Sequence, residues 1–391
     1  MLSAVTQRLW SDALSQLSIP EAEASGQTGS AAAAQPSNPG DPAPRRMQDS
    51  YCEIILPFAS SPELLEKYTN ATGGIRTGLL MEHLDSLAGS IAYKHMLGPE
   101  VKELPSNAGF YIVTASVDRC LDMLATLYPV RDMRLSGQVI HTGRSSMEVA
   151  DGTETTVMVG RFCMVARDSK TQKAKLVNSL TLETSEDCTL FNMGESDPQN
   201  KRQSMAVHSL DRVPPTSWES ENLHSLYLKY GSHTSAPSLQ HKDKDTVWMG
   251  DTRLEKTMVM FPQERNVHKK IFGGYLMRLA YELGFANSCL FTRGHVTFLS
   301  LDGIAFARPV PIGSLLCLTS NIHVCVHADV VNLATGTEQR TNDFRFTWCR
   351  ESGPALNRIV VPKTYGEAMQ WIEGRRALEM GSEIRKLRKR T

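Results

Sequence analysis

The chain has 391 residues, and 42 Lys and Arg residues balance 42 Asp and Glu residues, so the formal net charge is zero. This balance excludes an overall field that would draw the protein to nucleic acid or to an anionic membrane. Apolar residues make up 41% of the chain and charged residues 21%, which is a globular composition. The length predicts about two to three domains, and no apolar run reaches the roughly 18 residues of a membrane-spanning helix.

Residues 1–46 are predicted to be a flexible N-terminal segment and linker. Residues 5–17 have the apolar spacing of a helix, but Arg8 is their only arginine, which makes a weak mitochondrial presequence. Residues 25–44 are rich in Ser, Ala, Gly and Pro. They have too little apolar surface to offset the entropy lost on ordering, so folded sequence is expected from residue 47.

Two similar blocks follow, at 47–186 and 247–375. Each has a glycine-rich turn, then a long apolar segment with helical spacing, then alternating runs rich in Val, Thr and Phe that predict antiparallel strands. An offset of 196 residues aligns the helical segments and relates Gly78 to Gly274. The sequence therefore predicts an α+β fold of two tandem copies, each a long helix with an antiparallel sheet, which pair into one pseudo-symmetric body.

The strand regions of the two blocks also resemble each other. VTASVDRC (113–120) resembles TFLSLDGI (297–304), and RFCMVARD (161–168) resembles RFTWCRES (345–352), so both pairs share an offset of 184 residues. The less apolar residues 187–246 are predicted to connect the two domains and to contain one short helix. Residues 376–391 form a basic tail, for which a solvated or frayed helix end is expected.

Glycines at the start of each predicted helix are candidates for binding a carbonyl oxygen. Gly273 and Gly274 begin the second helix, and Gly78 follows Thr77 at the start of the first. Unpaired N–H groups and the positive end of the helix dipole can stabilise a developing oxyanion there. Close packing between helix and sheet explains the glycines as well, so that alternative stays open.

Asp85 is predicted to be a general base that acts on water. It lies one to two turns into the first helix among apolar neighbours, where a carboxylate is costly unless it is paired or used. A solvated acid at the helix edge is the alternative. The equivalent position in the second block is Tyr281, so the repeat has one acid and not two.

Asn266 precedes the second helix, where its amide can donate to water or to a carbonyl oxygen. An ordinary N-cap or turn residue is the alternative. Since only the first block has the acid, an acid and an amide that meet across the domain interface must be Asp85 and Asn266.

A second group of candidates could bind phosphate. Arg144, Ser145 and Ser146 follow Gly143 at the start of a predicted strand, and Arg308 has a similar place in the second block. A guanidinium and hydroxyl groups suit phosphate oxygens, although a plain hairpin turn also explains the first three.

Other reaction chemistries find little support. The eight cysteines form no C-x-x-C pair, and no histidine stands beside them at zinc-ligand spacing. Neither a metal nor a redox cofactor is predicted, and the cysteines and histidines are expected to be structural. The sequence has no G-x-S-x-G elbow, Walker motif or dinucleotide-binding glycine motif.

The segments LLMEHLDSLAGSIAY, SGQVIHTGRSSMEV and PQERNVHKKIFGGYLMRLAYE resemble double-hotdog acyl-CoA thioesterases of the mitochondrial acyl-coenzyme A thioesterase 9 type. The resemblance runs from about Arg45 to Trp371. It implies two tandem hotdog domains that hydrolyse fatty acyl-CoA to free fatty acid and CoA without a cofactor. In relatives an Asp and an Asn from different domains form the site, which implies Asp85 and Asn266.

The resemblance also implies further properties. CoA contacts are expected in the segments TASVD (114–118), which contains Ser116, RSSM (144–147) and LSLD (299–302). Acyl-CoA is the expected partner, the expected location is mitochondrial, with cytoplasmic as the alternative, and a homo-oligomer such as a trimer is expected. Two other functions stay open: a catalytically silent acyl-CoA binder, and a hotdog hydratase or dehydratase with a histidine such as His83 near the acid.

Overall fold

A computed structural model describes most of the chain beyond the predicted linker. The described residues are 43–71, 73–99, 109–123, 131–143, 146–150, 158–192, 194, 210, 213–230, 245–265, 270–322, 325–350 and 352–388. Three of the candidate site residues, Asn266, Arg144 and Ser145, lie outside them.

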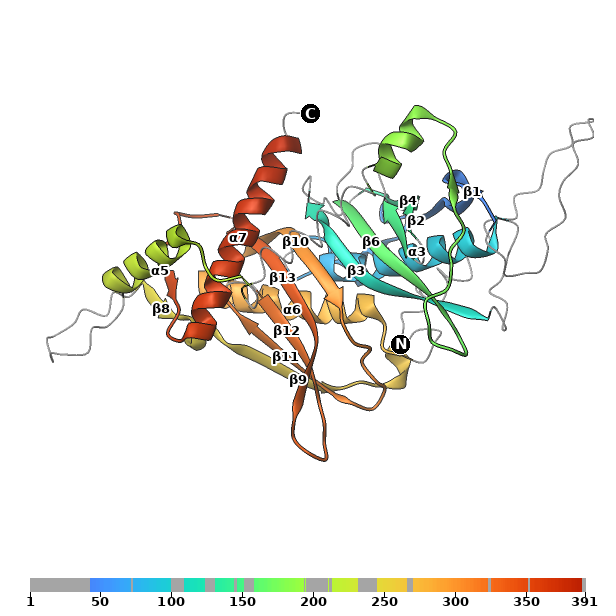
Figure 1. The fold of residues 1–391 in the computed structure, drawn as a ribbon. Helices are drawn as coiled ribbons and strands as arrows, with labels where there is room; N and C mark the ends of the chain where they lie inside the picture. Colours follow the sequence, from blue (N-terminus) through green and yellow to red (C-terminus); the bar gives the residue numbers. More distant parts are fainter. Residues whose placement is uncertain are drawn as a thin grey trace, which may run out of the picture.

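The first half of the chain, residues 43–192, contains one long helix and a set of strands (Figure 1). Its elements are β1 (Arg45–Arg46), η1 (Gln48–Ser50), β2 (Cys52–Leu56), α2 (Pro62–Tyr68), α3 (Thr77–Leu97), β3 (Phe110–Met123), β4 (Met133–Thr142), β5 (Ser146–Ala150), β6 (Met158–Asp168) and β7 (Leu180–Thr181).

The second half, residues 245–388, repeats this arrangement, and helix α5 (Ser217–Tyr230) precedes it. Its elements are β8 (Thr246–Trp248), η2 (Met249–Thr252), β9 (Leu254–Val259), η3 (Pro262–Glu264), α6 (Gly273–Thr292), β10 (Val296–Phe306), β11 (Leu315–Asn321), β12 (Cys325–Val331), β13 (Glu338–Arg350), β14 (Ile359–Val361) and α7 (Tyr365–Arg388).

A single 10-stranded sheet joins the two halves in the order β2-β4-β5-β6-β3-β10-β13-β12-β11-β9. Each half supplies one side, and the order in the second half mirrors that in the first. The strands β3 and β10 pair antiparallel at the centre, where Ser116 lies opposite Ala305. This palindrome confirms the predicted α+β fold of two tandem hotdogs, each a long helix against an antiparallel sheet.

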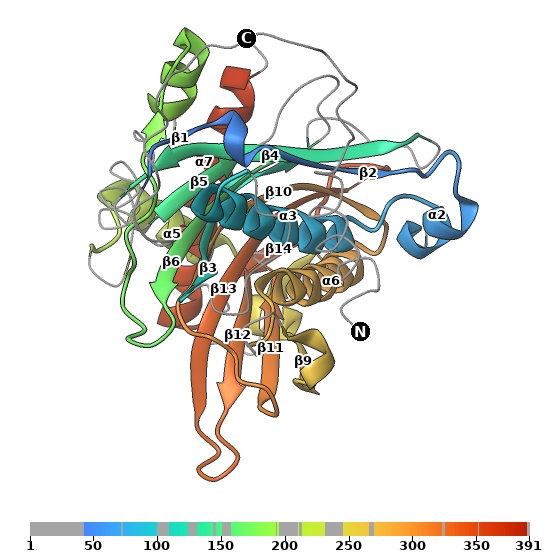
Figure 2. The ribbon, with the colours of Figure 1, turned by 90° about the vertical axis from the view of Figure 1, so that its right-hand side faces the viewer.

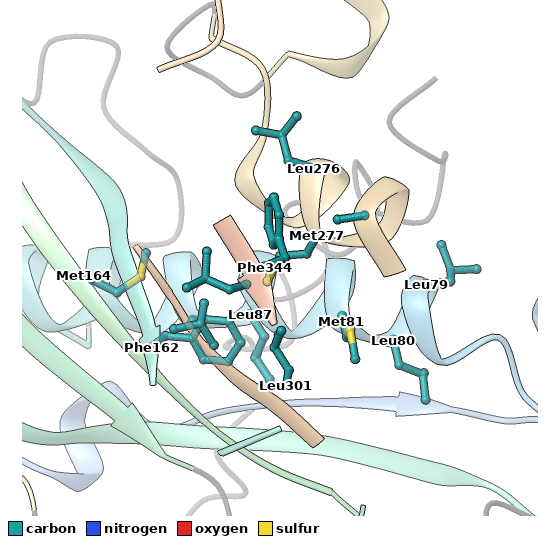
Figure 3. Close-up of a cluster of buried hydrophobic side chains, with 14 of the residues drawn as sticks. Leu79, Leu80, Met81, Leu87, Phe162, Met164, Leu276, Met277, Leu301 and Phe344 are labelled. Atoms are coloured by element: carbon teal, nitrogen blue, oxygen red, sulfur yellow. The ribbon is translucent and has the colours of Figure 1, made fainter. Parts of the chain in front are cut away.

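The long helices α3 and α6 lie side by side against the same face of the sheet (Figure 2). Their apolar side chains point toward the strands and toward each other (Figure 3), as Leu80, Met81 and Met277 do. In β6 the buried positions alternate, and Phe162 and Met164 face this core. The helix α3 is buried on nearly all sides because the sheet covers one face and α6 another, so its apolar pattern is broader than a single stripe.

One ion pair joins the two long helices within this core. Arg278 Nη1 of α6 lies 2.9 Å from Glu82 Oε2 of α3, and the Glu82 side chain is only 2% exposed. Burial raises the pKa of Glu82, while the charge of Arg278 opposes that rise.

The outer face of the second half carries α7, which crosses the strands opposite α6 (Figure 1). The helix runs past the domain boundary expected at residue 375. Arg376 makes a two-pronged ion pair with Glu219 of α5, at 2.6 Å from Nε to Oε1 and 2.7 Å from Nη2 to Oε2. Among the described residues, no helix is both long and apolar enough to cross a membrane.

Candidate active site

Asp85 lies at the contact between the two halves. Its Oδ1 accepts a hydrogen bond from the Thr114 hydroxyl of β3 at 2.7 Å, and its Oδ2 accepts one from the Gly274 N–H of α6 at 2.7 Å. Asp85 is eight residues beyond Thr77, where α3 begins, so it is slightly farther along the helix than expected. The carboxylate is 1% exposed and is therefore not a solvated acid at the helix edge.

The surroundings of Asp85 adjust its acidity in two opposite directions. Burial raises the pKa of Asp85 to about 6, and the hydrogen bonds from Thr114 and Gly274 counteract that rise. The positive end of the α6 dipole also faces the carboxylate. Because this pKa lies close to neutrality, Asp85 is mostly ionised at neutral pH and is still basic enough to accept a proton from water.

Glycine at the start of α6 allows this contact. A Cβ atom on Gly273 would lie 3.2 Å from Asp85 Oδ2, and one on Gly274 would lie 2.9 Å from the backbone of Glu82. Any side chain at Gly274 would therefore push α6 away from α3. Close packing, the alternative reading of these glycines, holds at Gly274. The N–H of Gly274 donates to Asp85 and is therefore occupied.

A cavity of about 990 Å³ opens beside Asp85 and is lined by both halves of the chain. Part of its wall is apolar and includes Gly89, Tyr93, Ile112, Met164 and Leu276. Four exposed cationic side chains also line it: Arg167, Arg265, Lys270 and Arg308. A cavity of this size and polarity suits a large ligand with an apolar end and an anionic end.

The cavity passes the free edge of β3. Pairing between β3 and β10 starts at Ser116, so no strand that the structure describes pairs with β3 residues 110–114 on that side. The pairing of β3 with β6 is irregular between Thr114 and Ser116, next to Asp85. Buried Ile112 and half-buried Tyr111 both line the cavity, although successive residues of a strand face opposite sides. The cavity thus connects the core side of the sheet with its outer face.

The remaining candidate residues lie in different parts of the structure, and only some of them reach the cavity. Arg308 lines the cavity, whereas Ser116 does not. Thr77 and Gly78 lie at the equivalent position beside Tyr281: a Cβ on Gly78 would be 3.1 Å from Tyr281 Cδ1, and Thr77 hydrogen-bonds to the Tyr281 side chain. Ser146 begins β5, opposite Val165.

Several residues of the cavity were not candidates from the sequence. Gly89 and Tyr93 have no local motif that would mark them. Thr114 belongs to the segment TASVD that was expected to contact CoA, but its bond to Asp85 was not predicted. The repeat holds a usable signal, because the offsets of 196 and 184 relate Gly89 to Phe285 and Thr114 to Phe298. Where one copy has a small or polar residue and the equivalent position of the other copy has an aromatic residue, the copy with the smaller residue is expected to have open space.

Two histidines lie in polar contacts away from the cavity. His83 Nε2 lies 2.6 Å from the Tyr68 hydroxyl, and burial lowers the pKa of His83 to about 4. His327 of β12 lies 2.6 Å from Asp343 Oδ1 of β13, with Cys325 nearby. The guanidinium of Arg340 contacts both His327 and Asp343, so a cation already lies where these groups converge.

No protein-family model matches the chain. Human mitochondrial acyl-coenzyme A thioesterase 9 is 37% identical over 365 residues, which cover 88% of this chain and 81% of that protein. Mouse mitochondrial acyl-coenzyme A thioesterase 10 is 36% identical and covers 85% of this chain and 78% of that protein. A solved acyl-CoA hydrolase from Staphylococcus aureus covers 37% of this chain and 95% of its own, at 20% identity and a TM-score of 0.35.

The paired hotdogs and the buried acid beside a large cavity are those of a thioesterase-type protein. At this identity and coverage, the chain belongs to the acyl-coenzyme A thioesterase family that includes acyl-coenzyme A thioesterase 9.

Proposed function

We propose that this acyl-CoA thioesterase hydrolyses fatty acyl-CoA to free fatty acid and CoA at one composite site between its two halves. The observation that carries the proposal is the contact of Asp85 from α3 with the first turn of α6, inside a cavity lined by both halves. Each half alone lacks one part of this arrangement.

Asp85 acts as the general base. Its two hydrogen bonds leave further lone pairs on the carboxylate for a water molecule. The water oxygen attacks the thioester carbonyl carbon while the proton passes to Asp85. The tetrahedral intermediate then collapses, the carbon–sulfur bond breaks, and the CoA thiolate leaves and takes the proton from Asp85. The fatty acid product releases its own proton to solvent. The N-terminus of α6, with the N–H of Gly273, stabilises the oxyanion.

Asn266 positions the attacking water in this proposal. It follows Arg265, which bridges to Ile271 across the loop before α6. Arg265, Lys270 and Ile271 all line the cavity, so both ends of the segment that contains Asn266 reach the site.

The phosphate groups of CoA bind at the outer part of the cavity. Arg308 lies there, and Arg167, Arg265 and Lys270 add three further cations that the sequence did not suggest. Arginine and lysine suit phosphate oxygens. Arg144, Ser145 and Ser146 remain candidates for the same ligand. Because the chain has no net charge, local cations must provide this attraction.

The two alternative functions are less well supported. A hydratase would need a histidine beside the acid, but His83 contacts Tyr68 instead and is not part of the cavity wall. A silent acyl-CoA binder would not need a buried carboxylate whose pKa of about 6 suits a base. We further propose a mitochondrial location, by analogy with the mitochondrial relatives. We also propose that the chain forms a homo-oligomer such as a trimer.

Release of CoA from a series of acyl-CoAs, measured with a thiol reagent, tests the function. The wild-type chain should release thiol, and Asp85→Asn should lower kcat by about 100- to 10,000-fold. Asn266→Ala should also lower kcat, and Arg308→Glu should mainly raise KM. Binding of acyl-CoA without thiol release would favour the silent binder, and full activity in Asp85→Asn would contradict the mechanism. Light scattering of the purified chain measures its assembly.

A further inference from the structure

The apolar part of the cavity has no task in the chemistry described so far. We call it the acyl chamber, and its wall consists of Gly89, Tyr93, Ile112, Met164 and Leu276. All four cations of the cavity are exposed and lie outside this wall. Since the CoA phosphates need those cations, a thioester held at Asp85 must direct its acyl group into the chamber.

The chamber follows one face of α3. Asp85, Gly89 and Tyr93 are spaced by four residues, so their side chains lie one above another along the helix. The eight residues from Asp85 to Tyr93 correspond to a rise of about 12 Å. This length accommodates a medium-chain acyl group and is shorter than an extended long-chain group.

Tyr93 lines the chamber about two turns beyond Asp85 along α3. Its hydroxyl accepts a hydrogen bond from the Ile112 N–H on the free edge of β3 at 3.1 Å, and its ring stacks on Phe110 with centroids 5.9 Å apart. The side chain is 5% exposed. Contacts on two sides hold the ring in place, so it forms a fixed wall.

Gly89 leaves the middle of the chamber open. Its equivalent in the second half is Phe285, and the equivalent of Met164 is Trp348. The rings of Phe285 and Trp348 lie 5.6 Å apart, and in the second half they fill the space that corresponds to the chamber. A large side chain at position 89 is therefore expected to occupy the path of an acyl chain.

We propose that Gly89 and Tyr93 determine acyl chain length: Gly89 admits the chain, Tyr93 ends the chamber, and medium-chain acyl-CoAs are the preferred substrates. This inference rests on the proposed thioesterase function. Each methylene group that the chamber buries should improve kcat/KM by about fourfold, up to the length that reaches Tyr93.

The experiment is a profile of kcat/KM from acetyl-CoA to palmitoyl-CoA, measured on the full chain. Gly89→Phe should lower the ratio of octanoyl-CoA to acetyl-CoA hydrolysis by about 100-fold. Tyr93→Ala should move the optimum to longer chains, whereas Tyr93→Phe, which keeps the ring, should keep the wild-type optimum. Ser90→Phe is the matched control for Gly89→Phe, since it places the same ring about 100° away on α3; its ratio should stay at the wild-type value.

Binding of unreactive S-alkyl-CoA thioethers of the same lengths separates this inference from the proposed function. If the chain binds them with a medium-length optimum but hydrolyses nothing, the thioesterase proposal fails and the chamber stands. If Gly89→Phe folds and keeps the wild-type profile, or Tyr93→Ala keeps the wild-type optimum, the chamber assignment is wrong while hydrolysis stands. If Gly89→Phe does not fold, the chain-length optimum of Tyr93→Ala compared with that of Tyr93→Phe tests the chamber assignment.

Discussion

The surroundings of Asp85 and of Tyr281 are equivalent places in two copies of one fold, and they have diverged in opposite directions. Both side chains face the first turn of the other long helix: Asp85 accepts the N–H of Gly274, and Tyr281 lies against Gly78. The first place keeps a buried carboxylate beside a cavity. The second keeps the helix contact and has no acid.

Aromatic rings fill the second place. Tyr281 lies 4.8 Å from Trp348 and 5.5 Å from Phe298 between ring centroids, and Phe285 packs on the same indole. Such pairs contribute about 0.5 to 1.5 kcal/mol each beyond the burial of their surface. The comparison separates two roles under the proposed mechanism: one copy supplies packing, and the other, with an acid of raised pKa and an open cavity, supplies the chemistry.

The largest effect is expected from matched substitutions at the two positions. Asp85→Asn should reduce kcat by about 100- to 10,000-fold, since it removes the base. Tyr281→Phe should leave kcat at the wild-type level, because it removes only a hydroxyl that bonds to Thr77. Thiol-release kinetics on both variants measure this. A comparable loss in Tyr281→Phe would show that the second place takes part in the reaction.

Returning an acid to the second place tests whether its aromatic packing is compatible with chemistry. Tyr281→Asp should lower the free energy of unfolding by about 3 to 5 kcal/mol, because it buries an uncompensated carboxylate among aromatic rings. Denaturant unfolding measures the loss. Turnover should not rise; a second active site in this variant would overturn the assignment of roles.

The glycines that begin the two helices should differ in tolerance. Gly274→Ala should cost about 1 to 3 kcal/mol of unfolding free energy, because its Cβ would meet the Glu82 backbone at 2.9 Å. Gly78→Ala should cost less, since its Cβ would meet the side chains of Tyr281 and Arg278, which can move. Thermal unfolding compares the two, and an equal cost would contradict the asymmetry.

The smallest expected effect concerns the acidity of Asp85. The pKa of Asp85 is about 6, so kcat/KM should rise with pH as this group loses its proton. The Thr114 hydroxyl favours the ionised form, so Thr114→Val should raise this pKa and move the acid limb of the profile up by about one pH unit. Thr114→Ser keeps the donor and should keep the wild-type limb. A downward shift in Thr114→Val would contradict the assignment.

The same buried carboxylate should make the protein less stable as pH rises, although activity rises with pH. A carboxyl group whose pKa is raised by folding favours its protonated form in the folded state. It therefore stabilises the fold below its unfolded pKa, and this contribution is lost as pH rises through about 6. Between wild type and Asp85→Asn, the difference in melting temperature should thus shift in favour of Asp85→Asn as pH rises.

Much of the architecture could be predicted because the internal repeat is visible as sequence similarity between the two blocks. The offset of 196 residues relates Asp85 to Tyr281 and shows that only one acid exists. The same offset predicts that Asp85 meets the start of the second helix through Asn266, whereas the described contact there is with the N–H of Gly274. The fold class is confirmed because helical and alternating apolar patterns are long and regular in both blocks.

The rest of the site depends on distances that no local pattern encodes. Thr114 reaches Asp85 because a strand and a helix lie against each other there. Its segment TASVD was expected to contact CoA, but no local pattern indicates a hydrogen bond to Asp85. Thr77 and Gly78 were candidates for the carbonyl, but the near two-fold arrangement puts them beside Tyr281. The start of each helix meets the middle of the other, so the glycines of the first block belong to the place without the acid.

The ion pair between Glu82 and Arg278 affects which hotdog halves can pair with each other. The two residues are 196 positions apart, so Glu82 in the first half and Arg278 in the second half are at equivalent positions of the repeat. Two first halves brought together would bury Glu82 against Glu82, and two second halves would oppose Arg278 with Arg278. Isolated buried charges cost several kcal/mol each. The ion pair therefore favours the pairing of a first half with a second half over the pairing of two identical halves. This holds both within one chain and for domain swapping between two chains.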